Sequence, residues 1–355
     1  MTADENGSYF KGRGAQINTH NKFLKDDYVK EHIEGIDDWE EENSKTKFII
    51  GASRTIVNKV ESPDVGMLYS LNPYQGCEHG CTYCYARNAH EYWGFSAGLD
   101  FERKIIVKKD APALFIKFLE KKGWDAQTIS LSGNTDCYQP AERKFRLTRQ
   151  LLEIALTYKQ PIGMITKNAL ILRDLDILQE MAKHNLCMVY LSINSLNEKL
   201  RAVMEPRTAT AKQRLKTLES LSNAGIPTGV MVAPLVPGLS DHEIPAVLKA
   251  VANAGALKAG YTVVRLNGAI AQIFEDWLRK NFPDRFDKVW HMIQSCHNGK
   301  VNDSRFGTRM RGEGNISQMI SDNFKLHCRL NNLNTKQIFL NSGSFKVPRA
   351  QTSLF

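Results

Sequence analysis

The sequence predicts an α/β protein built around a parallel sheet. Short β-rich segments alternate with amphipathic helical segments between about residues 68 and 266 of the 355-residue chain. This alternation is typical of parallel strands joined by right-handed helical crossovers. Six β-rich segments are too few for a complete eight-stranded barrel, so the pattern is compatible with an open doubly wound sheet or a partial barrel. In both architectures the chemistry belongs at the carboxyl ends of the strands.

The elements can be assigned in chain order. Residues 1–60 are expected to form an N-terminal extension, with a short helical pattern around residues 27–36 and no assigned chemistry. Strands are expected at residues 68–71, 128–132, 162–166, 188–193, 228–233 and 261–266, with a further short strand at a sheet edge, residues 104–107. Helical patterns cover residues 141–158, 171–184, 211–224 and 243–254. Gly225 and Gly255 follow the last two helices, where glycine often ends a helix.

The alternation stops after about residue 282, which sets the expected division of the chain. Residues 61–282 form the α/β core, residues 283–345 a C-terminal appendage and residues 346–355 a flexible tail. The formal net charge is +9, and residues 285–355 alone hold eleven Lys and Arg against four Asp and Glu, a net charge of +7. A surface with this positive charge favours the binding of a polyanion such as nucleic acid. The alternative is a solvated basic face that serves solubility.

Targeting signals and cysteine usage indicate a cytoplasmic protein. The N-terminal residues are polar and acidic, and the chain contains no apolar run of membrane-spanning length, so we expect no membrane association. Seven cysteines are too few and too unevenly spaced for a disulfide framework. Clustered cysteines in this chain are therefore interpreted as metal ligands or redox groups.

One short segment carries a metal-ligand pattern. Residues 76–84 read GCEHGCTYC, which places Cys77, Cys81 and Cys84 at the spacing C-x3-C-x2-C after the first predicted strand. Gly76 and Gly80 allow the backbone turns that would bring three thiolates around one centre. Because electron-transfer clusters and closed zinc sites use four ligands, three thiolates leave one metal position open to a small molecule. Zinc with His79 as the fourth ligand is the alternative, in a non-catalytic nucleic-acid-binding protein.

The cysteine motif and its surroundings resemble the radical S-adenosylmethionine (radical SAM) superfamily. Beyond the cysteines, several stretches resemble the spore photoproduct lyase-like branch, often called DNA repair photolyase-like, and the resemblance covers about residues 12–345. These stretches are residues 76–87, 134–136, 139–142, 165–167, 170–178 and 192–207. The resemblance implies a partial (β/α)6 TIM-like barrel of the radical SAM type, with an N-terminal extension and a basic C-terminal appendage.

The resemblance also implies cofactors and a reaction class. Cys77, Cys81 and Cys84 would ligate a 4Fe-4S cluster, and SAM would bind the fourth iron. Reductive cleavage of SAM would give a 5′-deoxyadenosyl radical that abstracts hydrogen from a substrate, and a flavodoxin or ferredoxin would supply the electron. The expected substrate is nucleic acid, in DNA repair or base modification by a lyase- or oxidoreductase-type reaction. A protein or small-molecule substrate is the alternative.

Polar residues at strand ends are assigned to SAM by the same resemblance. Tyr83, the aromatic before the third cysteine, would pack near adenine. Asn134, Thr135 and Asp136 follow the second strand and would bind the amino end and ribose of SAM, although such residues are also common in turns.

Four further residues complete the expected SAM site. Lys167 and Ser192 end the third and fourth strands and would contact the carboxylate and amino groups, with an exposed lysine as the alternative. Arg207, two residues after Glu205, could clamp a carboxylate or a phosphate. Ala233, which closes the fifth strand, would leave room for adenine.

The chain departs from the lyase pattern at the hydrogen-atom donor. The lyase has a further cysteine just before the segment that corresponds to residues 134–136, and Gly133 stands at that position here. Cys137 lies on the same predicted loop and is the candidate catalytic radical relay, with core filling as the alternative role of a free cysteine.

The C-terminal pentapeptide resembles a partner-binding motif. Residues Gln351, Thr352, Ser353, Leu354 and Phe355 resemble the peptide that binds the bacterial sliding clamp, with Thr352 in place of the usual Leu. An apolar Leu-Phe pair can dock in a hydrophobic pocket. A sliding clamp is therefore a candidate partner, and an unattached tail is the alternative.

Overall fold

The larger sheet of the protein contains the predicted parallel strands. The computed structural model describes residues 9–24 and 45–348. Seven strands follow the order β10-β9-β8-β7-β6-β3-β2, and the six strands from β3 to β10 are parallel. Their bounds are β2 (Val57–Lys59), β3 (Tyr69–Leu71), β6 (Ile129–Leu131), β7 (Ile162–Thr166), β8 (Cys187–Ser192), β9 (Thr228–Leu235) and β10 (Lys258–Val263). With β2 and β10 as its edges, this sheet is a partial barrel and not a closed one.

All six predicted strands are present, and the last is displaced along the sequence. We expected it at residues 261–266, but β10 begins three residues earlier, at Lys258. Lys258, Ala259 and Gly260 lack a β-rich pattern, and they join the sheet because β9 offers paired backbone groups from Gly229 to Met231. Tertiary pairing here overrides local sequence preference.

A second sheet corrects the expectation for residues 104–107. Strand β5 (Lys104–Val107) has the predicted bounds, but it lies in the middle of a three-stranded sheet and not at an edge. It pairs in parallel with β1 (Lys47–Ile50) and antiparallel with β4 (Tyr74–Gln75). Because β4 leads directly into the cysteine motif, this sheet fixes the start of that loop.

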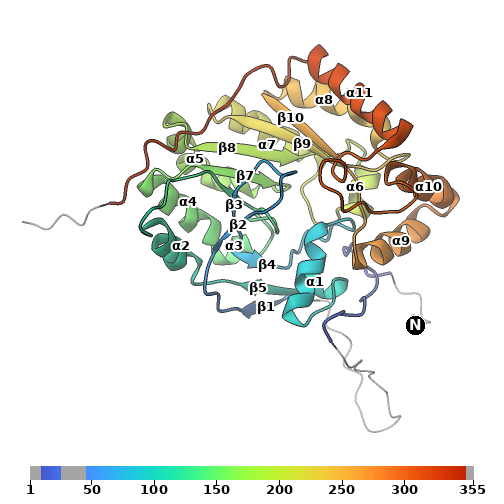
Figure 1. Cartoon of the computed structure of the whole chain (residues 1–355), viewed down its shortest axis with the longest axis horizontal. Helices are drawn as coiled ribbons and strands as arrows, with labels where there is room; N and C mark the ends of the chain where they lie inside the picture. The colour runs from blue at the N-terminus through green and yellow to red at the C-terminus, as the bar shows by residue number, and fades with distance from the viewer. Residues whose placement is uncertain (1–8, 25–44, 349–355) are drawn as a thin grey trace, which may run out of the picture.

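The helices are arranged around the larger sheet and beside the three-stranded sheet (Figure 1). Their bounds are α1 (Leu99–Arg103), α2 (Ala111–Leu119), α3 (Glu142–Phe145), α4 (Leu147–Tyr158), α5 (Leu175–Lys183), α6 (Glu198–Met204), α7 (Ala211–Asn223), α8 (Ile244–Asn253), α9 (Ala269–Asn281), α10 (Phe286–Cys296) and α11 (Gly314–Leu330). Short 3-10 helices are η1 (Tyr85–Trp93), η2 (Ala169–Asp174), η3 (Asp241–Glu243) and η4 (Pro283–Arg285). Gly225 and Gly255 have φ of 76° and 89°, which confirms their predicted place after α7 and α8.

One predicted helix is broken. Residues 141–158 were expected to be continuous, but the chain turns at Arg146, whose φ is 50°. The side chain of Glu142 accepts a hydrogen bond from the amide of Thr148 at 3.1 Å, and this bond satisfies a donor at the start of α4. The buried carboxylate of Glu142 thus separates α3 from α4.

The main hydrophobic core lies between the larger sheet and its helices, and it includes residues from the C-terminal part. Ile320, Phe324 and Cys328 of α11 pack in the same cluster as the strand residues Val230 and Val263. The expected division at residues 60, 282 and 345 stays a prediction. The helix expected at residues 27–36 and the pentapeptide Gln351–Phe355 fall outside the described residues.

The chain after α11 runs across the amino ends of the strands (Figure 1). The amide of Asn334 donates to the carbonyl of Leu257 just before β10, and that of Asn341 donates to Asn185 just before β8. The amide of Lys346 donates to Tyr158 at the end of α4. This crossing closes the end of the sheet that is opposite the carboxyl ends.

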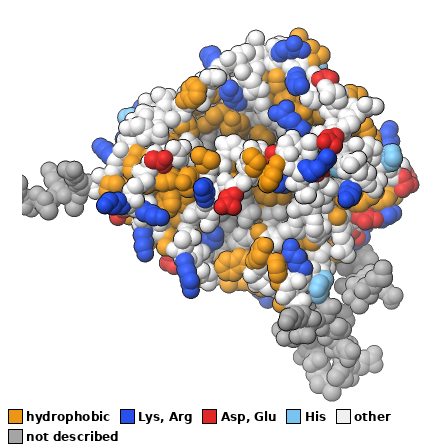
Figure 2. All heavy atoms as spheres, in the orientation of Figure 1, with side chains coloured by type: hydrophobic (Ala, Val, Ile, Leu, Met, Phe, Trp, Pro, Cys, Tyr) orange, Lys and Arg blue, Asp and Glu red, His pale blue; other side chains and the backbone are white. Residues whose placement is uncertain are grey.

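The surface is hollowed on one face. Figure 2 shows a depression near the centre of the view, with hydrophobic and basic side chains around it. In the part of the chain that the structure describes, no helix combines the length and the apolar character needed to cross a bilayer.

Candidate active site

The three clustered cysteines lie on an irregular loop between β4 and η1. Gly76 and Gly80 have φ of 80° and 69°, which confirms the predicted backbone turns. Long-range hydrogen bonds fix the loop, because the amide of Cys77 donates to Phe101 at 2.9 Å and that of Thr82 donates to Met204 at 3.1 Å.

The thiols share one environment. Cys77 and Cys81 are buried, Cys84 is half-buried, and all three are free of disulfides. Burial is the main cause that raises the pKa of Cys77 well above its ordinary value and the pKa of Cys81 to about 12, and the charges of neighbouring cysteines act in the same direction. Buried thiols whose ionisation is disfavoured need a bound cation to hold them as thiolates. This donor set fits an iron–sulfur cluster.

His79 is occupied by protein contacts and is not available as a metal ligand. Its Nδ1 lies 3.3 Å from the carboxylate of Asp136, and its Nε2 lies 3.3 Å from the amide nitrogen of Asn168. Among the described residues, no group of three or more His, Cys, Asp or Glu side chains is gathered around the position of a single ion. The zinc alternative therefore lacks its fourth ligand.

Asp136 ties the ends of two strands to the cysteine loop. Its carboxylate accepts hydrogen bonds from the Thr166 hydroxyl and the Lys167 amide, both at 2.8 Å, in addition to its contact with His79. Burial would raise the pKa of Asp136, but His79 and these donors together lower it to about 2. A carboxylate held ionised by three partners organises the loops after β6 and β7.

Asn134 and Thr135 face the segment that precedes the cysteines. The side-chain amide of Asn134 donates to Gln75 at 3.1 Å, and the hydroxyl of Thr135 donates to the carbonyl of Tyr74 at 2.8 Å. The structure thus brings these predicted residues beside the loop and gives each a protein partner.

The side chains of Lys167 and Ser192 make no hydrogen bond or ion pair in the described part of the chain. The ammonium of Lys167 lies 5.9 Å from the ring centroid of Tyr83. Burial lowers the pKa of Lys167, but the nearby Cys81 and Glu205 outweigh burial and raise it. Ser192 is buried at the carboxyl end of β8. A charged ammonium and a hydroxyl at adjacent strand ends suit a carboxylate ligand.

Glu205 is the centre of a buried network that sequence reasoning missed. Its carboxylate accepts hydrogen bonds from the hydroxyl of Tyr83 and, at 2.6 Å, from Arg214. Arg214 also donates to the carbonyl of Ser192 at 2.7 Å, so one guanidinium joins the end of β8 to the tyrosine of the cysteine motif. No sequence pattern predicted the role of Arg214, because it lies on α7 and its position is that of an ordinary helical residue.

Arg207 lies beside the cysteine loop, and Ala233 does not close the fifth strand as expected. The guanidinium of Arg207 lies 3.7 Å from the carboxylate of Glu78, and its amide donates to the carbonyl of His79. Ala233 is half-buried in β9, which continues two residues beyond it. Their assignment to SAM stays a prediction.

Cys137 lies in the main hydrophobic core. It is fully buried, its amide donates to the Ser132 hydroxyl, and its carbonyl accepts from Thr148. This environment favours packing, and the radical-relay role stays a prediction. At Gly133 an added Cβ would lie 2.6 Å from the Cβ of Ser70, so this backbone has no room for a side chain there.

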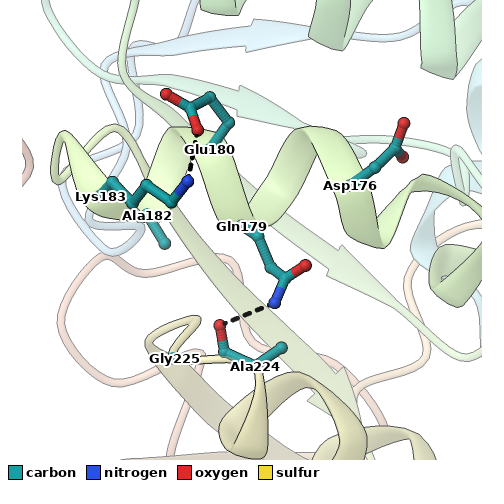
Figure 3. A pocket seen from close by; sticks show the side chains of 7 residues that line it. All are labelled: Asp176, Gln179, Glu180, Ala182, Lys183, Ala224 and Gly225. Atoms are coloured by element: carbon teal, nitrogen blue, oxygen red, sulfur yellow. Dashed lines mark hydrogen bonds and ion pairs between the residues drawn. The ribbon is translucent and has the colours of Figure 1, made fainter.

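The pocket drawn in Figure 3 is remote from these residues. It is lined by α5 residues from Asp176 to Lys183 and by Ala224 and Gly225, which precede β9. Lys183 pairs with Glu180 at its rim. The pocket therefore lies at the amino ends of the strands, away from the cysteines.

Comparison with known proteins decides the family. The sequence profile of the radical SAM superfamily matches residues 71–251, which include the cysteine loop and strands β6 to β9. The chain belongs to the radical SAM superfamily. The protein is therefore an enzyme that uses a 4Fe-4S cluster and S-adenosylmethionine, and Cys77, Cys81 and Cys84 are the donor set that fits the cluster.

Relatives of this radical SAM enzyme occur in bacteria and archaea. An uncharacterized protein from Mycobacterium tuberculosis is 32% identical over 236 residues, which cover 65% of this chain and 69% of the relative. An uncharacterized protein from Methanocaldococcus jannaschii is 29% identical over 248 residues, with 70% and 88% covered.

The fold is similar to that of spore photoproduct lyase. One solved structure of a lyase mutant has a TM-score of 0.61 at 16% identity and covers 84% of this chain and 85% of the lyase. The lyase complexed with dinucleoside spore photoproduct has a TM-score of 0.60 at 16% identity, with 80% and 79% covered. These values confirm the predicted partial barrel of the radical SAM type.

We predict that each cysteine of the motif is required for cluster binding. Changing Cys77, Cys81 or Cys84 to Ser should abolish iron retention after anaerobic reconstitution and, with dithionite, the formation of 5′-deoxyadenosine, because two thiolates do not hold the cluster. Iron and sulfide analysis measures the outcome. The control Cys328→Ala, in α11, should retain both; equal iron in a motif variant would contradict the ligand assignment.

We predict that Glu205→Gln destabilises the metal-free protein. Removing the carboxylate leaves Arg214 buried without its charge partner, so the free energy of unfolding should fall by about 3 kcal/mol. Chemical denaturation measures this change. The control Glu275→Gln removes an exposed partner of Arg279 and should have little effect. Equal effects of the two substitutions would show that the Glu205 network is not stabilising.

Proposed function

We propose that this radical SAM enzyme acts on nucleic acid, by abstracting a hydrogen atom in DNA repair or base modification. The cluster and SAM, when bound, supply the radical chemistry. The chain's own residues hold the reacting groups, exclude water and bind the substrate. One observation carries the choice of substrate: an arginine at the carboxyl ends of the strands has no charge partner among the described residues.

Arg265 follows β10 by two residues, at the carboxyl ends of the strands. Its side chain is half-buried and makes no hydrogen bond or ion pair among the described residues. Burial and then the nearby Arg309 lower its pKa, whereas Asp64 and Tyr85 act in the opposite direction. A desolvated guanidinium without a partner favours an anionic ligand such as a phosphate.

The neighbours of Arg265 do not neutralise it. Asp64 accepts hydrogen bonds from Arg309 and from the amide of Gly307, and Asp303 pairs with Arg305. Both acids are therefore engaged elsewhere, and the guanidinium of Arg265 has no direct charge partner among the described residues.

Exposed aromatic rings lie in the same part of the molecule. Tyr85, which follows the third cysteine, is half exposed, and its hydroxyl donates to the carbonyl of Gly133 at 2.5 Å. Phe306 is exposed, and the guanidinium of Arg309 lies 4.3 Å from its ring centroid. Cations interleaved with aromatic faces are typical of surfaces that bind unpaired or flipped bases.

The overall charge and the fold support the same substrate class. The chain carries a formal net charge of +9, most of it after residue 285. Spore photoproduct lyase, which has a similar fold, has been solved with a dinucleoside ligand. A lyase reaction, a flavodoxin or ferredoxin donor, a cytoplasmic location and the clamp-binding role of residues 351–355 stay predictions from the sequence.

We predict that Arg265→Gln weakens the binding of single-stranded DNA. Log affinity falls as log salt rises, and loss of one phosphate contact should reduce the magnitude of this negative slope by about one. Fluorescence anisotropy at several salt concentrations measures it. The control Lys183→Gln removes a positive charge at the amino ends of the strands and should bind as the unmodified protein does. No binding by the unmodified protein at about 50 mM salt would favour a protein or small-molecule substrate.

We predict that deuterium from DNA enters 5′-deoxyadenosine. The reconstituted enzyme with dithionite and SAM should transfer deuterium from DNA labelled in the base or sugar, because hydrogen abstraction forms the new C–H bond. Mass spectrometry of 5′-deoxyadenosine identifies the labelled position. The proposed substrate would be rejected if 5′-deoxyadenosine stayed unlabelled with every labelled DNA and formed equally well without DNA.

A further inference from the structure

The N-terminal segment, residues 9–24, packs directly against the cysteine loop. A Cβ placed on Gly14 would lie 1.7 Å from the carbonyl oxygen of Gly80, which stands between the first two cluster ligands. Only a glycine allows this approach of the two backbones. The segment lies outside the residues that match the superfamily, so the contact is not part of the matched core.

Glu102 joins the N-terminal segment to the interior. Its fully buried carboxylate accepts hydrogen bonds from the amide of Gly14 at 3.2 Å and from that of Ala15 at 2.8 Å. The guanidinium of Arg87 is its charge partner at 2.5 Å. The N-terminal segment therefore completes the hydrogen bonding of a buried ion pair, which would be costly if it were only partly satisfied.

Arg87 connects this pair to a cluster ligand. Its Nε donates to the carbonyl of Cys81 at 2.9 Å, and Nη1 donates to the carbonyls of Ala97 and Gly98 at 3.1 and 2.9 Å. The guanidinium also lies 5.2 Å from the ring centroid of Phe101. With four of its five N–H groups bonded to protein oxygens and no exposure to solvent, Arg87 is held in place and restrains the backbone of Cys81.

A second backbone contact holds the N-terminal segment in register. The amide of Leu99 donates to the carbonyl of Ile17 at 3.2 Å, and a Cβ on Gly98 would lie 2.0 Å from that same oxygen. The segment thus contacts both the cysteine loop and the carbonyls to which Arg87 donates.

We propose that residues 9–24, Glu102 and Arg87 form a clamp that controls the retention and the midpoint potential of the 4Fe-4S cluster. The segment fixes Glu102, Glu102 orients Arg87, and Arg87 fixes Cys81. The potential of a cluster depends on nearby charge, on hydrogen bonding around its ligands and on solvent access, and the clamp acts on all three. Arg87 and Glu102 are positioning residues, because they act through the ligand loop.

The positional part of the clamp is tested by Gly14→Ala, which forces the segment away from Gly80. In the metal-free protein, iodoacetamide should modify Cys77 and Cys81 several-fold faster, as measured by mass spectrometry. The reconstituted variant should lose iron to a chelator several-fold faster. The control Gly66→Ala adds a methyl group in open space and should match the unmodified protein in both assays. Unchanged thiol reactivity and iron loss in Gly14→Ala would overturn the clamp.

The electrostatic part is tested by the midpoint potential of the reconstituted cluster, followed by electron paramagnetic resonance. Arg87→Gln leaves the negative charge of Glu102 near the cluster and should shift the potential to more negative values. Glu102→Gln leaves the positive charge of Arg87 and should shift it to more positive values. Arg87→Lys retains the charge but loses the Nε bond to Cys81, so it should lose iron faster with a smaller shift in potential.

A double variant keeps the test valid if a lone buried charge prevents folding. Arg87→Gln/Glu102→Gln removes both charges, and its potential should lie between those of the single variants where they fold. Its iron loss should be faster than that of the unmodified protein, because a glutamine side chain does not reproduce the set of bonds that the Arg87 guanidinium makes. A double variant with unchanged iron loss would overturn the proposal.

Discussion

The structure depends on the way in which an irregular loop is held by groups from distant parts of the chain. Residues 76–84 form no helix or strand of their own, so no regular pattern of local hydrogen bonds fixes their backbone. Phe101, Met204 and the side chain of Arg87 supply partners for Cys77, Thr82 and Cys81. A cluster needs ligands whose positions change little between its redox states, and contacts with rigid elements provide this.

Charge is arranged around the loop in a consistent way. Acidic groups close to the cysteines are matched by cations, as in the pairs Glu102–Arg87 and Glu205–Arg214. Asp136 is similarly satisfied by His79 and by backbone and hydroxyl donors. In contrast, Lys167 and Arg265 make no ion pair within the described residues. The acids of these pairs are thus neutralised, and the cations near the strand ends that lack ion pairs support the proposed binding of the SAM carboxylate and a substrate phosphate.

The two ends of the sheet are used differently. The carboxyl ends carry the cysteine loop, Asp136, Lys167 and Ser192, whereas the chain after α11 covers the amino ends with backbone hydrogen bonds to Leu257 and Asn185. Packing of Ile320 and Phe324 in the main core makes this C-terminal part continuous with the barrel. Such a division between a functional end and a stabilising end is general for parallel α/β barrels.

The sequence by itself determined the features that depend on local pattern. Periodicity predicted the alternation of strands and helices. The backbone freedom of glycine predicted the turns at Gly76 and Gly80 and the glycines after α7 and α8. The spacing of the three cysteines predicted that they form one ligand set. Tertiary structure alone decided which distant residues meet. Glu142 interrupts a predicted helix, Arg214 reaches Glu205, and Gly14 lies against Gly80 because packing brings together side chains and backbones whose separation in sequence carries no periodic signal. For the same reason Cys137, placed on the predicted SAM loop, is found in the hydrophobic core, since burial depends on the whole fold and not on neighbouring residues.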